Sequence, residues 1–494
     1  MVDNSNYRET LASRPPRPSL PFKPLAKASK ESNLSEFSQT DGLKTAPISQ
    51  DSGNENRRFF SGAWVKILVV VFLLILVGAV GYYFWSSRKD GSSGGLSSSE
   101  IVLEYWGLWE PESVTNGLIS EFEEDNPGVE IKYTQQTIID YRKRLQSALA
   151  SGNGPDIFRI HNTWLPMFVD DLDPVPDELA ESLSLENNYY PVVKQSLFSQ
   201  GSFYGIPLMI DTLALFYNRD ILDQHQLSPP QDWDQFRQVA NQLTIRDEER
   251  RILQAGAAMG TASNVDHWSD ILGLMMIQNG ALVAGPYGDD AQQALDFFLV
   301  FTKQDQVWNE TLPDSTRAFA GGKLAFYFAP SWRIVNLYEI NPDLNFGVVA
   351  VPQLPEREPL AWATFWAEGV SVRADELKQE TAWKFLEFLS QKESLERIFK
   401  AGSQVHYIGQ LYPRIDMAGQ LADDPLLAPF VNQAAYAKSW YLASRTADDG
   451  LNDGIIKYFE DAVNRSLLKA ESELETTVTQ GVTSVLSKYQ VGRL

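Results

Sequence analysis

The chain has 494 residues, of which 44% are hydrophobic and 21% charged, so it can form two or more packed units and is not disordered throughout. Its formal net charge is −22, and residues 101–494 alone carry 55 acidic against 30 basic side chains. Because phosphate binding needs concentrated Lys and Arg, this charge argues against nucleic acid as a partner. The absence of cysteine excludes disulfides, thiolate metal sites and catalytic thiols.

Histidine is also scarce. No two of the four histidines have a spacing typical of metal ligands, such as i and i+4: His161, His225, His267 and His406. We therefore expect no metal site and no cofactor.

Near the N-terminus, residues 67–85 (ILVVVFLLILVGAVGYYFW) contain no charge, which predicts a helix long enough to cross a membrane. Aromatic residues at both ends, from Trp64 to Trp85, resemble interfacial belts, so we expect a transmembrane helix over 64–85. Ten Lys or Arg residues precede the uncharged stretch 67–85 and only Arg88 and Lys89 closely follow it, which predicts an N-terminus in the cytoplasm.

A cleaved signal peptide is the alternative for this segment. Its apolar region would be about 7–15 residues long and would end in small residues, whereas bulky Tyr and Trp stand here. Residues 1–60 are rich in Pro, Ser and charge and are expected to be a disordered cytoplasmic tail, and residues 86–99 (SSRKDGSSGGLSSS) a flexible linker. These features predict a single-pass protein of the cell membrane, with residues 100–494 extracellular or periplasmic.

The large outer unit begins with alternating strand and helix patterns. IVLEY (101–105) alternates as a strand, and Val114, Leu118 and Phe122 share one face of a helix that ends at DNPG. VEIKY (129–133) is a second strand. It is followed by a helix that carries Tyr141, Leu145 and Leu149 on one face. PDIFRI (155–160) is the third strand. This order predicts an α/β fold with a parallel sheet covered by helices.

In such sheets ligands bind beyond the carboxyl ends of the strands. The residues found there combine flat aromatic rings with polar groups: Trp106, Trp109 and Glu110 after the first strand, and His161, Asn162 and Trp164 after the third.

Five sequence blocks then occur in a characteristic order: FEEDNPGVEIKY, ASGNGPDIF, YGIPLMIDTLALFYNRDIL, PPQDWDQF and AFAGGKLAFYFAPSW. Together they resemble the extracellular solute-binding proteins that serve ABC sugar importers, the maltose-binding type being the best known. The resemblance covers about residues 100–490.

The resemblance implies a two-lobed periplasmic-binding-protein-like fold that closes on a ligand. Lobe 1 is expected at about 100–211 plus 366–411, and lobe 2 at about 212–365 plus 412–494. It also implies that Asp211 and Trp366 belong to the cleft, and that Ser331, Trp332 and Arg333 face it at the exit of a buried strand that begins after Gly321 and Gly322. The full set of expected ligand-binding residues is Trp106, Trp109, Glu110, Asn162, Trp164, Asp211, Ser331, Trp332, Arg333, Trp366 and Glu368.

These residue types suit a sugar, whose apolar ring faces pack on tryptophan and whose hydroxyls pair with carboxylates, amides and guanidinium groups. Structural roles compete with this interpretation. Trp233 and Trp383 lie in helical patterns and are expected in the core, Trp106 could close the core, and Asp211 could be a hinge hydrogen-bonding residue. Arg333 could form a surface salt bridge, and Glu110 could be an ordinary charge at a helix start.

The predicted function is a membrane-anchored substrate-binding protein that captures a sugar or oligosaccharide and passes it to the permease subunits of an ABC importer, with no nucleic acid partner. Three alternatives stay open. A glycoside hydrolase would also combine carboxylates with tryptophans, but no acid and base pair and no G-x-S-x-G motif stands out, so we expect no enzyme and no catalytic residue. The same fold could bind a polyamine or another cation, or serve a sensory or adhesive role.

Overall fold

The structure is a computed structural model that describes residues 101–281, 288–469, 474 and 477–491, all within one compact unit, Leu96–Leu494. The expected tail (1–60), transmembrane helix (64–85) and linker (86–99) lie outside the described residues. Within the described ranges, none of the helices combines the length and the apolar character needed to span a bilayer.

The first lobe is built on a mixed sheet with the strand order β2-β1-β3-β15-β4. Strand β1 pairs in parallel with β2 and β3, as predicted, and β15 runs antiparallel to β3. Short β7 pairs with β15 on the same sheet. The strands are β1 (Ile101–Gly107), β2 (Val129–Gln135), β3 (Ile157–His161), β4 (Leu172–Asp173), β7 (Ile206–Pro207) and β15 (Trp366–Ser371).

Helices cover this sheet and supply its core. The helices predicted around Val114 and Tyr141 are confirmed, and Trp383 lies buried in a helix, as expected. The helical segments of this lobe are α2 (Glu112–Asp125), α3 (Tyr141–Ala150), α4 (Leu165–Phe168), η2 (Val169–Asp171), α5 (Asp177–Ser182), α6 (Pro191–Leu197), α13 (Glu376–Leu389) and α14 (Lys392–His406); a hairpin of β5 (Phe198–Ser199) and β6 (Ser202–Phe203) completes it.

The second lobe has its own sheet, in the order β10-β11-β12-β9-β13. Its strands are β9 (Ala214–Asn218), β10 (Ile245–Arg246), β11 (Ile252–Ala257), β12 (Leu324–Ala329) and β13 (Phe346–Val349). Its helices are α7 (Arg219–Gln224), α8 (Trp233–Leu243), α9 (Trp268–Asn279), α10 (Asp289–Lys303), α11 (Ser315–Ala320), α12 (Arg333–Ile340), α16 (Leu451–Leu468) and α17 (Thr477–Lys488).

The predicted turn before β12 is present. Helix α11 ends at Gly321, and Gly322 has a φ of 70°, a left-handed conformation that glycine adopts without strain. All six residues of β12 are buried, so the strand that follows the turn is a core strand, as expected.

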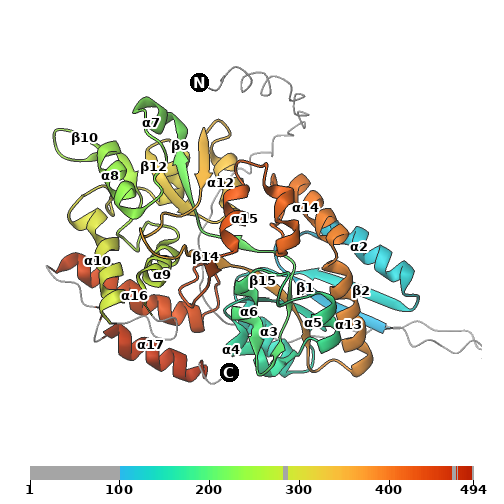
Figure 1. Ribbon diagram of the computed structural model, residues 1–494. Helices are drawn as coiled ribbons and strands as arrows, with labels where there is room; N and C mark the ends of the chain where they lie inside the picture. The colour runs from blue at the N-terminus through green and yellow to red at the C-terminus, as the bar shows by residue number, and fades with distance from the viewer. Residues whose placement is uncertain (1–100, 282–287, 470–473, 475–476, 492–494) are drawn as a thin grey trace, which may run out of the picture. The chain divides into compact units, whose positions relative to one another are not determined.

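The chain changes lobe at a small third sheet, which lies between the two large ones in Figure 1. Strand β8 (Asp211–Thr212) leads into β9 and pairs antiparallel with β14 (Ala361–Thr364), which in turn leads into β15. Strand β16 (Ala437–Lys438) pairs with β14, and α15 (Ala428–Ala434) packs on β8; the 3-10 helix η3 (Ile415–Leu421) precedes α15. The residue limits given above to the two lobes stay a prediction.

Candidate functional site

A cavity of about 570 Å³ lies between the two lobes. It is lined from the first lobe by residues that follow β1 and β3 and begin β15, and from the second lobe by the exit of β12 and by helices α9 and α12. The third sheet and the segment His406–Leu411 after α14 complete its wall. Its size is that of a small-molecule site.

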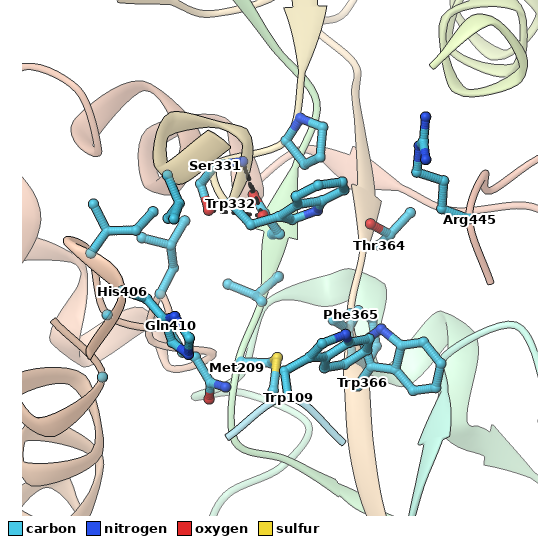
Figure 2. Close-up of a pocket in the computed structure, with 18 of the residues that line it drawn as sticks. Trp109, Met209, Ser331, Trp332, Thr364, Phe365, Trp366, His406, Gln410 and Arg445 are labelled. Atoms are coloured by element: carbon cyan, nitrogen blue, oxygen red, sulfur yellow. Dashed lines mark hydrogen bonds between the residues drawn. The ribbon is translucent and has the colours of Figure 1, made fainter. Parts of the chain in front are cut away.

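Tryptophans form two opposed parts of the wall. Trp109 and Trp366 of the first lobe meet edge to face, with ring centroids 4.9 Å apart. Trp332 of the second lobe lies across the cavity from them in Figure 2. Trp109 and Trp332 are each 41% exposed, far more than a large aromatic side chain of the core. The cavity therefore offers open aromatic surface on both lobes.

Each aromatic group is held in place from behind. His161 lies opposite Trp366 in the ladder of β3 and β15, and Trp164 packs against the same indole at 5.1 Å. On the other side, the Arg333 guanidinium lies 4.4 Å from the centre of the Trp332 ring. A cation at this distance from an indole face is favourable. Trp332 and Trp366 are therefore fixed on the two lobes before any ligand binds.

His161 is a buried, neutral group in the cavity wall, since burial lowers its pKa to about 3. Its Nδ1 lies 2.7 Å from Thr163 Oγ1, which donates to Asn452 Oδ1 at 2.8 Å, and 3.3 Å from the backbone nitrogen of Thr163. These contacts fix the imidazole beside Trp366.

Asp211 is half-buried at the lobe crossing, where β8 pairs with β14. Its carboxylate accepts bonds from the backbone N–H and the hydroxyl of Ser331, at 3.0 and 2.8 Å, and from the N–H of Thr212 at 2.8 Å. Burial raises its pKa to about 7, and these donors oppose the rise. Both oxygens are therefore engaged within the protein, as in the hinge role considered from the sequence.

Asp270 is a second carboxylate whose two oxygens both have protein partners. Oδ1 accepts from Trp362 Nε1 at 2.9 Å and from the N–H of Ser444 at 3.0 Å, and Oδ2 lies 3.2 Å from His267 Nδ1. The other nitrogen of His267 accepts from Arg333 Nε at 3.2 Å. Burial lowers the pKa of His267, which favours its neutral form. This network fixes the wall beside Trp332.

Glu110 lies in the cavity wall and pairs with Arg159, a buried residue of β3. The same guanidinium donates from Nε and Nη2 to Oε1 of Glu368, at 2.8 and 2.6 Å. Burial raises the pKa of Glu368, and Arg159 opposes the rise. One guanidinium thus serves two carboxyl groups.

Of the expected ligand-binding residues, the structure brings six together in the wall: Trp109, Glu110, Asp211, Ser331, Trp332 and Trp366. The other five do not line it: Trp106, Asn162, Trp164, Arg333 and Glu368. Trp164 is fully buried, and Trp106 packs against the core. Asn162 instead joins the lobe crossing to neighbouring loops, accepting from Phe365 N and donating to Ser196 Oγ and Ser439 Oγ.

Sequence reasoning missed several wall residues. Met209, Trp362 and Phe365 lie at or beside the lobe crossings, His406 ends α14, and Gln410 and Arg445 come from irregular segments. Thr364 and Phe365 immediately precede Trp366, so their place next to an expected site residue was a usable signal. Nothing in the pattern around Arg445 indicates that a segment so late in the chain returns to the cavity.

Comparisons with known proteins agree with this architecture. Residues 117–428 match the sequence profile of a family described as bacterial extracellular solute-binding protein. A maltotriose-binding protein of Pyrococcus abyssi is 21% identical over 414 residues, which cover 80% of this chain and 81% of that protein. A diacetylchitobiose-binding protein of Streptomyces coelicolor is 22% identical, with 65% of this chain and 76% of that protein covered. The solved structure of a sugar-binding protein from Xanthomonas citri superposes with a TM-score of 0.65 at 20% identity, covering 80% of this chain and 98% of that chain.

Proposed function

The chain belongs to the bacterial extracellular solute-binding protein family, and we propose that it binds a carbohydrate between its lobes and delivers it to an ABC importer without chemical change. The observation that carries the proposal is the pair of open tryptophan surfaces, Trp332 on one lobe and Trp109 with Trp366 on the other. Indole faces match the apolar faces of a sugar ring. The relatives named above bind maltotriose and diacetylchitobiose, which supports an oligosaccharide.

The charges of the cavity support a neutral ligand over a polyamine. Asp211 and Asp270 use both of their oxygens within the protein, and Arg445 pairs with Asp266. A cationic ligand would have to compete with these hydrogen bonds for both carboxyl groups. A neutral sugar leaves them intact and gains most from aromatic contact.

These pairings also support binding without catalysis. A general acid or base has to exchange a proton with the ligand, and a carboxyl group whose two oxygens both bond within the protein is less available for that. We therefore assign no catalytic role to Asp211 or Asp270, in keeping with the solute-binding relatives.

Binding acts through a shift between open and closed lobes. A sugar that contacts Trp332 and Trp366 at once does so only when the lobes are close, so its contacts with the second lobe provide the differential affinity for the closed form. The importer would then recognise the closed form.

A thermal-shift screen of the full-length protein in detergent tests the proposal. Maltotriose, maltotetraose, diacetylchitobiose, putrescine and spermidine are the probes, because a ligand that binds only the folded state raises the melting temperature. We expect at least one oligosaccharide to raise it and neither amine to do so. A higher melting temperature with the amines alone would indicate a cationic ligand instead of a sugar. No rise in melting temperature with any sugar would contradict the proposal.

Membrane anchoring by residues 64–85 is part of the proposal and rests on the uncharged stretch 67–85 and the basic residues before it. Tethering would raise the effective concentration of the receptor at its permease. The test is fractionation of cells that express the full chain. Release by detergent but not by high salt or alkaline carbonate is expected, and full recovery in the soluble fraction would contradict the anchor.

A further inference from the structure

The carboxyl groups of the cavity wall differ in whether an oxygen is free of protein hydrogen bonds and can accept one from a ligand. Asp211 and Asp270 have no unengaged oxygen, as described above. In Glu110, Oε2 accepts from Arg159, whereas Oε1 has no hydrogen-bond partner among the described residues. Glu339 at the rim of the cavity is solvent-exposed and already accepts from Asn336, so its bonds to a ligand would compete with water.

Glu110 is nevertheless a buried group, with 6% of its surface exposed. An ionised carboxylate in such a place is costly unless a cation compensates it. The compensating cation is Arg159, which is 3% exposed and does not line the cavity. Without Arg159, the buried carboxylate would lose its cationic partner and the charge-assisted hydrogen bond that orients it.

The direction of the Arg159 guanidinium is set by Glu368. These two residues lie directly opposite each other in the ladder of β3 and β15. Glu368 Oε1 takes the Nε and Nη2 hydrogens, so Nη1 is the donor that is left for Glu110. The fork geometry of the guanidinium then fixes where Nη1 points.

The backbone of Glu110 is held as well. Tyr133 in β2 donates its hydroxyl hydrogen to the carbonyl of Glu110 at 2.7 Å. The charged and titratable groups around the Glu110 carboxylate come from several elements of the first lobe: Tyr105 in β1, Tyr133 in β2, Arg159 in β3 and Glu368 in β15. Arg159 is the sole cation of this set.

We propose that Arg159 is a positioning residue for specificity: it pairs with Glu110 and orients its carboxylate so that Oε1 accepts a hydroxyl of the sugar that packs on Trp109 and Trp366. The inference rests on the proposed function. It gives a part in hydroxyl recognition to Arg159, which does not line the cavity, and none to Asp211.

The test measures discrimination rather than affinity alone. The probe is the tightest binder among maltotriose, maltotetraose and diacetylchitobiose, together with its monodeoxy derivatives, each of which lacks one hydroxyl. Dissociation constants are measured by calorimetry on the full-length protein in detergent. In the natural protein one derivative should bind at least about tenfold more weakly, as expected for loss of a charge-assisted hydrogen bond.

Three variants separate positioning from a structural role. Glu110→Gln should reduce the preference for that hydroxyl to about twofold, since a neutral amide replaces the carboxylate. The double variant R159Q/E368Q should do the same although neither residue contacts the ligand. It removes the cation together with one of its two carboxyl partners, so Glu110 alone is left without its cation, and the variant has a better chance of folding than Arg159→Gln. Glu368→Gln alone keeps an acceptor for Arg159 and should retain the preference.

The outcomes are distinct. Full discrimination in the double variant, with melting and circular dichroism showing a folded protein, would overturn the role of Arg159. Full discrimination in Glu110→Gln would overturn the role of Glu110. Failure of the natural protein to bind any of the three oligosaccharides would contradict the proposed function itself, and this inference with it.

Discussion

The carboxylate of Asp211 in β8 accepts hydrogen bonds from both the backbone N–H and the hydroxyl of Ser331, at 3.0 and 2.8 Å. Asp211 stands where the chain leaves the first lobe, and Ser331 follows β12, the central strand of the second. The contact therefore fixes the lobe crossing to the second lobe, next to Trp332. It also places a titratable group in the cavity wall.

The first prediction is a dependence of stability on pH through Asp211. The pKa of this group is raised to about 7 in the folded protein and is near 3.9 in an unfolded chain, so the folded state binds more protons between these values. The free energy of unfolding therefore loses a contribution as pH rises from about 4 to 7. The whole shift would correspond to about 4 kcal/mol; because Asp211 faces a solvent-accessible cavity, we expect a smaller loss, on the order of 2 kcal/mol.

Denaturant titrations at several pH values measure this loss, with Asp211→Asn as the comparison. The amide keeps the shape of the side chain and has no proton to lose. The difference in unfolding free energy between the two proteins should therefore change over that pH range. A constant difference from pH 4 to 8 would show that the carboxyl group does not titrate there.

The second prediction concerns Gly273 in α9, which packs against Trp362 in the cavity wall. A methyl group at position 273 would lie 2.5 Å from the Trp362 ring, whose Nε1 is also bonded to Asp270. Gly273→Ala should therefore destabilise the protein by about 1–3 kcal/mol through overpacking. It should also weaken sugar binding, because Trp362 lines the cavity and its ring would have to shift.

Gly419→Ala is the matched control, since Gly419 is exposed and a methyl group there meets nothing within 4 Å. Its effect on the unfolding free energy should stay within about 0.5 kcal/mol. Equal melting temperatures for the two alanine variants would mean that Trp362 adjusts without cost.

The third prediction assigns Asn162 to the hinge. Asn162→Ala removes the acceptor of the Phe365 N–H and the donor to Ser439 Oγ. Because these partners are buried, we expect a loss of about 2–3 kcal/mol in unfolding free energy. The exposed Asn153, which bonds only within its own turn, provides the comparison variant Asn153→Ala. If the two variants were equally stable, water would have to replace the lost bonds.

The fold and the site differ in how far local sequence predicts them. Strands β1 and β2 and helix α2 follow from the spacing of apolar residues, and the turn at Gly322 follows from its glycine pair. Trp332 and Trp366 could be placed in the cavity wall because each stands next to a strand end in a recognisable block. Their contact with a ligand stays a prediction.

Other features depend on contacts between distant segments. Arg159 and Glu368 are 209 positions apart and meet only because β15 returns beside β3. Asn162 and Ser439 are separated by 277 positions. No local pattern shows that these polar residues satisfy one another. The sequence analysis expects Asn162 and Glu368 among the ligand contacts; in the structure neither lines the cavity, and their side chains bond to Phe365 and Arg159.

The fourth prediction tests the aromatic wall. Trp332→Ala should weaken binding of the preferred oligosaccharide by about tenfold, or 1.4 kcal/mol, since it removes the main aromatic surface of the second lobe. The fold should be little affected, because the ring is 41% exposed. Trp332→Phe should recover part of the affinity.

Phe198→Ala is the control, since Phe198 is 39% exposed and lies outside the cavity wall. The sugar affinity of this variant should equal that of the natural protein. Calorimetry gives the affinities and thermal melting the stabilities. An unchanged affinity in Trp332→Ala would mean that the sugar packs on the first lobe alone, and closure would then need another source of differential binding.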